Sequence, residues 1–590
     1  MSLSLKTAPF RDARYAPRSL DVERRADGSV ILTNTTPFEQ KHQTTLSALA
    51  HWAQAAPQRT WLAERSGEGW RHLTFSEAWQ RIAAVAGGLR GMGVVGAGPL
   101  LILARNGIDH AIIKYAAMSQ GMPVAPVSPQ YGMPGANLSR LTHAVEVLAP
   151  AAVFTEDAAL FAEGLSAPCL DGLPVIALRN PRPGDRPFAD LFASPSALPS
   201  ARPEDHAKYL LTSGSTGHPK AVICTHRAMS LNSAQIAACF ADDEPPVMVN
   251  SAPWSHSLGA NAILHMAAHR GGSVYIDAGQ PTAGRFAETI RNLTEISPTY
   301  QNMVPAGWML FAGELERDGD LARRFFERVR VLQYGGASLG QDIGDRIQAV
   351  AVKTIGEKIS FSSGYGATET GPTACNVHWH NDRMGMIGLP LPGTSVKLVP
   401  AAGKLEFRVK GPQITEGYLG RPELSAQSFD DQGFYQIGDA ARFVDPQDPR
   451  AGMVFDGRLS ENFKLASGTF VGVGELRIGA VGAVGDAVTD AVVCGEGREG
   501  VGLLFFPNPA LERAVVEAAA AAGITAFNAR AKGAGGRIAR ALVLDGPPDA
   551  GAGEITEKGY IAQALVRSRR AADVERLFAD PVLPGVLAFP

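Results

Sequence analysis

The chain has 590 residues, more than one core usually supports, so two or more domains are expected. Hydrophobic residues make up 45% and charged residues 19% of the chain. The formal net charge of −3 gives no indication of a basic surface that would bind nucleic acid. The five cysteines have no CxxC spacing, which favours a reducing compartment over a zinc site or a disulfide framework. Without an apolar signal region or an apolar run of about 18 residues, we expect a cytoplasmic protein with no membrane partner.

Helix-like and strand-like patterns alternate from about residue 75. Residues 75–93 predict an amphipathic helix that ends in glycines, and residues 108–121 predict another. Strands are predicted within 99–107, 122–129, 245–253, 271–279 and 329–338. Strands separated by helices of this length predict βαβ units with a parallel, two-sided sheet.

The pattern of the sequence changes from about Gly403. Residues 403–420 and 432–446 have short alternating stretches with frequent Gly and Pro, which predict antiparallel strands or a small distorted barrel. After Gly457-Arg458 a smaller unit of mixed α and β character follows, and its Ala-rich tract Ala514–Ala522 predicts a soluble helix because it carries Glu517. We therefore expect an α/β fold, with a large N-terminal domain at 1–458 and a small α+β C-terminal domain at 459–590.

The segment Tyr209–Lys220, YLLTSGSTGHPK, carries the strongest chemical signal. An apolar strand enters a loop of glycines and hydroxylated residues, and a Pro-Lys pair follows. Inward-facing backbone amides, hydroxyls and a mobile cation are what binding a polyphosphate requires. The loop is not a Walker A motif, because Lys220 is followed by Ala221 and GxxxxGK[ST] does not fit. The alternative is an ordinary Ser/Gly surface loop.

Seven further sequence motifs follow this loop along the chain. They are SAPWSHSLG at Ser251–Gly259, VLQYGGASL at Val331–Leu339, SGYGATETGP at Ser363–Pro372, GPQITEGY at Gly411–Tyr418, YQIGDAARF at Tyr435–Phe443, the Phe455–Leu476 segment and GEITEKGYI at Gly553–Ile561. Together they resemble the superfamily of acyl-CoA synthetases, adenylation domains and luciferases, over nearly the whole chain.

Three segments narrow this resemblance. DGRLSENFKLASGTFV, GEITEKGYI and LAERSGEGWRHLTFSEAW look like bacterial feruloyl-CoA synthetases, which activate hydroxycinnamic acids with ATP and coenzyme A. The KLASGTFV part is also similar to the adenylation domain of carboxylic acid reductases, although we expect no room for a carrier and a reductase domain.

The resemblance implies an ATP site in the large domain. Thr368 would contact the α-phosphate, and Glu369 would help to hold Mg²⁺, which prefers carboxylate and phosphate oxygens. Tyr365 would stack on adenine beside Gly366, and Asp439 would accept hydrogen bonds from the ribose. The β- and γ-phosphates would be held by Thr212, Ser213, Gly214, Ser215, Thr216, Gly217 and Lys220. The backbone of Gly335, Gly336 and Ala337 would pass close to the base, and Arg458 would support Asp439.

The resemblance also implies a mobile C-terminal domain that brings Lys558 to the reacting oxygens as the catalytic lysine. Here Ile-Thr-Glu-Lys-Gly replaces the usual Ser-Gly-Lys surroundings. Lys464 would lie near the acyl-phosphate or the thiol channel, Ser460 would be the pivot, and Gly468 would let pantetheine pass. Family members commonly have Asp or Lys at the pivot, so this serine is a departure.

An acyl pocket is expected around the SAPWSHSLG segment. Its predicted lining is apolar and aromatic, which suits a flat aromatic acid. The predicted lining residues are Trp254, His256, Ser257, Gly259, Met303, Val304 and Tyr334. His256 would orient the carboxylate or gate the pocket.

Several of these residues have a purely structural alternative. Glu369 could be a carboxylate at a helix N-terminus, Asp439 and Gly468 could be turn residues, and Lys558 could be a solvated lysine. His256 could be a structural hydrogen-bonding residue, and Gly335-Gly336 could be an ordinary strand-to-helix turn.

The leading hypothesis is an ATP-dependent acid–thiol ligase that makes feruloyl-CoA or a related hydroxycinnamoyl-CoA. One alternative uses another aromatic acid, such as benzoate, or loads an acyl carrier protein. Another is a catalytically idle nucleotide-binding protein. The oligomeric state is left open, a homodimer included.

Overall fold

The computed structural model describes residues 4–197, 199–213, 219–241, 244–282, 284–336, 338–401, 403–459, 463–531, 533–549, 552–555 and 561–589. The chain divides into two compact units. The first comprises Met1–Leu398, Arg408–Ile437 and Phe443–Val454, and the second Val399–Phe407, Gly438–Arg442 and Phe455–Pro590. The domain boundary expected after Arg458 stays a prediction.

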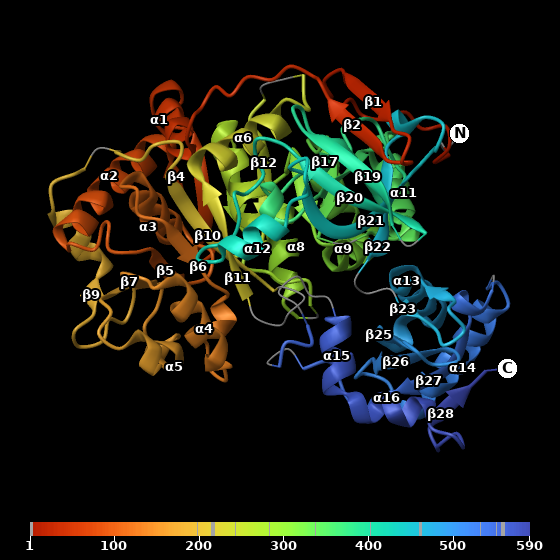
Figure 1. The fold of residues 1–590 in the computed structure, drawn as a ribbon. Coiled ribbons are helices and arrows are strands. Elements are labelled where there is room, and N and C mark those ends of the chain that lie inside the picture. Colours follow the sequence, from red (N-terminus) through yellow and green to blue (C-terminus); the bar gives the residue numbers. More distant parts are fainter. Residues whose placement is uncertain are drawn as a thin grey trace. The chain divides into compact units, whose positions relative to one another are not determined.

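A seven-stranded sheet in the first unit carries the strand of the predicted phosphate loop (Figure 1). Its neighbouring strands pair in parallel except β10 and β11, which pair antiparallel. Its order is β11 (Pro219–Thr225), β10 (His206–Ser213), β6 (Val124–Pro126), β5 (Leu100–Leu103), β7 (Ala152–Thr155), β8 (Val175–Ala177) and β9 (Arg186–Pro187). All four residues of β5 are buried, as expected for a central strand of a two-sided sheet.

Two further sheets include strands predicted from the sequence. The four-stranded sheet has the order β12 (Val247–Asn250), β13 (Ser273–Ile276), β3 (Thr60–Ser66) and β4 (Gly69–Thr74). The eleven-stranded sheet has the order β1 (Leu20–Arg24), β2 (Val30–Asn34), β19 (Ser395–Ala401), β20 (Lys404–Lys410), β21 (Tyr435–Phe443), β22 (Met453–Arg458), β18 (Met386–Pro390), β17 (Cys375–Asn376), β16 (Ser360–Tyr365), β15 (Val331–Gly335) and β14 (Tyr300–Met303). Strands β14–β16 are parallel, and β16, β17 and β18 are joined antiparallel.

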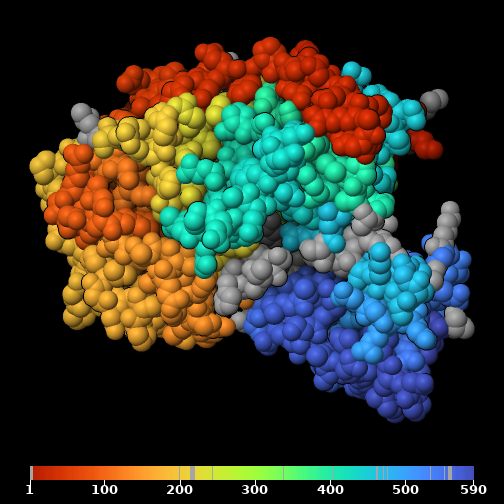
Figure 2. Space-filling model, viewed as in Figure 1, coloured from red at the N-terminus to blue at the C-terminus, as the bar shows by residue number. Residues whose placement is uncertain are grey.

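Helices of the first unit begin and end close to the sequence signals. Helix α2 (Phe75–Gly91) starts at a capping box, in which Thr74 Oγ1 accepts from Glu77 N at 3.2 Å and Glu77 Oε2 accepts from Thr74 N at 2.9 Å. The other α-helices are α1 (Thr45–Ala55), α3 (Ile108–Ser119), α4 (Leu138–Leu148), α5 (Ala162–Leu165), α6 (His226–Ala237), α7 (Met266–His269), α8 (Phe286–Glu295), α9 (Pro305–Arg317), α10 (Gly319–Phe326), α11 (Gln341–Ile355) and α12 (Pro422–Gln427). Figure 2 shows the turquoise segment that carries α12 at the surface, in agreement with its lack of buried residues.

Short helices of other types complete the first unit. Leu258–His265 forms the π-helix η4, and Thr368–Thr370 forms the 3-10 turn η5. Because π-helical turns often occur at functional sites, η4 is of special interest. The remaining 3-10 helices of this unit are η1 (Pro129–Tyr131), η2 (Pro168–Leu170), η3 (Phe188–Ala193) and η6 (Pro449–Ala451).

The second unit has a core of its own. Its strands are β23 (Phe463–Lys464), β24 (Phe470–Val471), β25 (Val488–Cys494), β26 (Val501–Pro507), β27 (Ile538–Val543) and β28 (Val586–Ala588). Its helices are α13 (Val473–Val484), η7 (Gly485–Ala487), α14 (Arg513–Asn528), η8 (Ala534–Gly536), α15 (Gln563–Arg569) and α16 (Ala571–Phe578). Helix α14 contains the Ala-rich tract and buries Val516, Ala520 and Ile524 on one face, so the predicted helix is confirmed.

An ion cluster ties β19, β20 and the segment before β21 together in the first unit. Asp430 pairs with Lys397, and Arg408 Nη1 lies 3.1 Å from Asp430 Oδ2. The Lys397 and Asp430 side chains are only 6% and 5% exposed. Burial alone would raise the pKa of Asp430, but hydrogen bonds from Lys397, the backbone N–H of Phe434 and Arg408 lower it to about 2.

Asp430→Asn should destabilise the fold by about 3–5 kcal/mol, because it leaves the Lys397 ammonium buried without its counter-charge. The folded-state pKa lies below the ordinary 3.8, so the wild-type advantage is complete above pH 4 and is lost as the pH falls toward 2. Urea denaturation at several pH values measures this difference. As a control, Glu68→Gln removes a carboxylate that is 98% exposed and should change stability by less than about 0.5 kcal/mol. Equal effects of the two substitutions would contradict the role of Asp430.

Candidate active site

The predicted phosphate loop connects two antiparallel strands. Thr212 near the end of β10 lies opposite Lys220 at the start of β11, and Ser213 lies opposite Pro219. Lys220 is therefore a strand residue, because the pairing of β11 begins before it. The connecting residues Gly214, Ser215, Thr216 and Gly217 lie outside the described residues, as does the side chain of Ser213.

Glu369 is buried in a hydrogen-bonded cluster of the first unit. The Tyr418 hydroxyl donates to Glu369 Oε1 at 3.0 Å and lies 2.9 Å from the Tyr435 hydroxyl. The Thr415 N–H donates to the Glu369 carbonyl oxygen at 2.8 Å. Burial raises the pKa of both tyrosine hydroxyls far above the ordinary value of a phenol, so both keep their protons at neutral pH. The glutamate thus has a fixed orientation.

Lys220 belongs to the same cluster. Its Nζ atom lies 5.0 Å from the centre of the Tyr418 ring, within the range of a cation–π contact. Tyr418 also forms an isolated antiparallel bridge with Val222 of β11. Strand β11 and the 3-10 turn of Glu369 therefore both contact Tyr418. The Lys220 ammonium lies over the face of its ring, and its hydroxyl donates to the Glu369 carboxylate.

Thr368 joins this turn to the SAPWSHSLG segment. Its Oγ1 atom lies 3.1 Å from Ser257 Oγ, and both side chains are buried. The Leu258 N–H donates to His256 Nδ1 at 3.1 Å. The predicted residues Thr368, Glu369, His256 and Lys220 are thus linked, through Ser257 and Tyr418, into one region of the first unit.

The residues predicted around adenine lie at the ends of β15 and β16. Gly335 pairs with Gly364 in parallel, and Tyr365, the last residue of β16, is half-buried. Gly336 has φ +85°, which favours glycine, whereas a Cβ atom at Gly366 would lie 2.2 Å from the Pro372 carbonyl oxygen. Ala337 lies outside the described residues.

The remaining predicted ligands belong to the second unit. Arg458 Nε lies 3.4 Å from Asp439 Oδ1, and Asp439 is a β21 residue that is 8% exposed. Lys464 ends β23, and Gly468 occupies the turn before β24 with φ +79° and open space where a side chain would begin. Lys558 and Ser460 lie outside the described residues. The roles of all these residues stay predictions.

The structure spreads the predicted acyl-pocket residues over several elements. Met303 and Tyr334 are paired across β14 and β15, and Val304 is the N-cap of α9. Gly259 packs against the Ala252 carbonyl oxygen, 2.3 Å from where a Cβ atom would be. Trp254 lies in the hydrophobic core at 2% exposure. Its indole ring lies 5.2 Å from the His110 ring, centre to centre.

Tyr418 and Tyr435 are the site residues that the sequence interpretation missed. Both end or begin motifs quoted above, GPQITEGY and YQIGDAARF, but a tyrosine there has no local pattern that indicates a partner. Tyr435 could have been identified because it shares a motif with Asp439, the predicted ribose ligand, whereas Tyr418 has no predicted nucleotide ligand in its motif.

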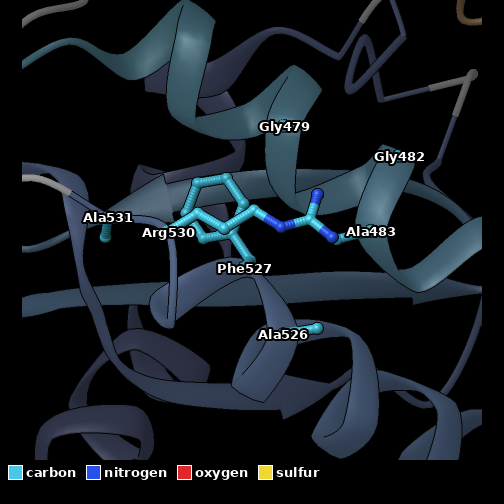
Figure 3. Close-up of a pocket in the computed structure, with 7 residues that line it drawn as sticks. All are labelled: Gly479, Gly482, Ala483, Ala526, Phe527, Arg530 and Ala531. Carbon is cyan, nitrogen blue, oxygen red and sulfur yellow. The ribbon is translucent and has the colours of Figure 1, made fainter.

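Metal clusters, membrane-spanning helices, cysteines and cavities were compared with the predicted site. The described residues contain no group of three or more His, Cys, Asp or Glu side chains that could hold a metal ion, and no described helix is long and apolar enough to cross a membrane. The five cysteines are free. A cavity of ≈590 Å³ lies between α13 and α14, where Phe527 and Arg530 are its largest lining residues (Figure 3). No predicted site residue lines it.

Comparison with known proteins identifies the family. Residues 49–419 match the family described as AMP-binding enzyme, and residues 479–581 match the AMP-binding enzyme C-terminal domain. A feruloyl-CoA synthase from Amycolatopsis sp is 27% identical over 384 residues, which cover 62% of this chain and 71% of the relative. A 4-coumarate–CoA ligase from Oryza sativa subsp. japonica is 25% identical over 409 residues, which cover 65% of this chain and 69% of the relative.

Solved structures share the fold. The adenylation domain of a carboxylate reductase from Mycobacterium chelonae has a TM-score of 0.73 at 20% identity, covering 91% of each chain. An anthranilate CoA ligase in complex with anthranoyl-AMP has a TM-score of 0.72 at 17% identity, covering 90% of this chain and 98% of the other. Since the first family match alone spans more than half of the 590 residues, the chain belongs to the AMP-binding enzymes of the adenylate-forming superfamily.

Proposed function

We propose that this enzyme activates an aromatic carboxylic acid with ATP and transfers the acyl group to coenzyme A, releasing pyrophosphate and AMP. Feruloyl or a related hydroxycinnamoyl group is the proposed acyl group. The observation that carries the proposal is the cluster of Lys220, Tyr418, Glu369 and Thr368 in a chain of the AMP-binding enzyme family. The feruloyl-CoA synthase and 4-coumarate–CoA ligase relatives support the choice of acid.

The reaction must convert a poor acylating agent into a good one. A carboxylate oxygen attacks the α-phosphorus of ATP, the bond to the β-phosphate oxygen breaks, and pyrophosphate leaves. The thiol of coenzyme A then attacks the acyl carbon of the adenylate, AMP leaves and the thiol proton is released. Two anions have to meet in the first step, so positioning and charge neutralisation are the main tasks of the protein.

The residues of the first unit suit these tasks. Lys220 would neutralise the β- and γ-phosphates beside the predicted loop, and Thr368 would donate to the α-phosphate. Glu369 would hold Mg²⁺: a single oriented carboxylate fits this ion, which is often bound by one or two carboxylates and substrate phosphates. Bound Mg²⁺ would offset phosphate charge as pyrophosphate departs.

The second unit would complete the site. Asp439, held by Arg458, would accept hydrogen bonds from the ribose, and Tyr365 of the first unit would stack on adenine. A mobile domain at 459–590 would present Lys558 for the first step. It would then rotate about Ser460 to present Gly468, beside Lys464, for the second. The left-handed turn at Gly468 and the open space beside its Cα agree with close passage of pantetheine.

The proposal is tested by measuring AMP release from ATP in the presence of each acid of a panel, with and without coenzyme A. Ferulate, 4-coumarate and cinnamate should give rapid coenzyme-A-dependent release, whereas benzoate and hexanoate should be slower. Release from aliphatic acids alone would contradict the substrate class. Carboxylate-dependent adenylation that coenzyme A cannot discharge would favour an acyl carrier protein as the acceptor.

Lys558→Ala should cripple acyl-adenylate formation, because the cation that faces the two reacting anions is lost. Thioester formation from supplied feruloyl-adenylate and coenzyme A should stay close to wild type. Separate assays of pyrophosphate release and thioester formation measure the two steps. The matched control is Arg498→Ala, which removes an exposed cation of the second unit that pairs with Glu575. Equal loss in both steps, or loss in neither, would show that Lys558 does not have this role.

A further inference from the structure

Two lysine side chains lie in the interior of the first unit. Lys114 on α3 and Lys208 on β10 are both 0% exposed. Lys208 Nζ donates to Asn261 Oδ1 at 2.6 Å and lies 3.1 Å from His265 Nε2. His265 Nδ1 lies 2.6 Å from the Tyr115 hydroxyl. Among the described residues Lys114 Nζ has no hydrogen-bond partner, and it lies 5.4 Å from the centre of the Trp254 ring.

No acid compensates these amines within the part of the chain that the structure describes. Asp109, five residues before Lys114, is already paired with Arg71 and Arg81. His110 lies against Trp254, and its Nδ1 atom is hydrogen-bonded to the Arg105 carbonyl oxygen, while its Nε2 atom has no hydrogen-bond partner in the described part of the chain. The cluster therefore presents ammonium and imidazole groups to one buried region without a carboxylate.

The charged form of these amines is costly inside the protein when no anion is bound. An interior ammonium without a counter-charge loses its hydration and gains no ion pair in return. Burial accordingly lowers the pKa of Lys208 to about 8 and lowers the pKa of Lys114 well below its ordinary value. A small anion between the two amines would favour their protonated forms, whereas a neutral or cationic ligand would not.

The cluster is connected to the candidate active site through the π-helix η4. The π-helix η4 begins at Leu258, next to Ser257, whose Oγ contacts Thr368, and it carries Asn261 and His265 toward Lys208. Burial raises the pKa of the Cys224 thiol to about 11; Lys208 opposes this rise and Glu369 adds to it, so both charges act on the same thiol.

We propose that the Lys114–Lys208 cluster is an internal binding site for a carboxylate or similar small oxyanion. The anion would bridge the two amines, with Asn261, His265 and His110 around it. It has two possible sources: a free anion from solution, or an oxyanion at the far end of the acyl substrate. The second source rests on the proposed function, and the first does not.

The free-anion source is tested by thermal unfolding of the full chain in sodium formate, with sodium gluconate keeping the ionic strength constant. The unfolding midpoint of the wild type should rise with each tenfold increase in formate. Lys208→Met and Lys114→Met should each abolish this rise. Lys358→Met should retain it, because that lysine pairs with Asp382. If one methionine variant does not fold, Lys114→Gln provides the second measurement.

The substrate source is tested by pyrophosphate–ATP exchange with cinnamate and 4-carboxycinnamate. Lys208→Met should lower the ratio of kcat/KM for 4-carboxycinnamate over cinnamate by about tenfold or more, since a charge-assisted contact is lost. A formate response or this change of ratio supports the oxyanion site and identifies its source. Absence of both overturns it. If no acid supports exchange, the proposed function fails while the formate experiment still decides the anion site.

Discussion

The hydrogen bond from the Tyr418 hydroxyl to Glu369 Oε1 is the interaction on which the candidate active site depends. A carboxylate that is 8% exposed would be costly to bury without donors. Tyr418 supplies one, is itself joined to Tyr435, and lies under the Lys220 ammonium. One tyrosine thus fixes the distance between a cation and an anion that come from β11 and from the turn after β16.

The first unit also buries two lysine side chains, Lys114 and Lys208. Glu369 accepts a hydrogen bond from the Tyr418 hydroxyl, whereas Lys114 Nζ lies over the Trp254 ring and has no hydrogen-bond partner among the described residues. Neighbours of both groups lie on η4 or just before it: Ser257 contacts Thr368, and Asn261 accepts a hydrogen bond from Lys208. Because a buried amine without a hydrogen-bond partner is rare in folded proteins, the proposed ligand gives the second cluster a physical explanation.

Local patterns predicted much of the fold, and tertiary contacts decided the rest. Helix 75–93 was predictable from its amphipathic pattern and terminal glycines, and the structure has it at Phe75–Gly91, starting at the capping box of Thr74 and Glu77. The bond between Tyr418 and Glu369 spans 49 residues and has no periodic signal. Burial of Lys208 was equally unpredictable, since lysine is almost never fully buried and β10 otherwise reads as an apolar strand. The strand at Lys220 was not predicted, because its pairing with Thr212 cannot be read from Gly and Pro content.

Carboxylate-dependent pyrophosphate–ATP exchange at a series of Mg²⁺ concentrations tests the central interaction most directly. With circular dichroism verifying the fold, Tyr418→Phe should lower exchange by about 10- to 100-fold and raise the Mg²⁺ concentration required, because Glu369 loses its orienting donor. Tyr435→Phe, one hydrogen bond further away, should have a smaller effect. Wild-type exchange and an unchanged Mg²⁺ requirement in folded Tyr418→Phe would contradict the account.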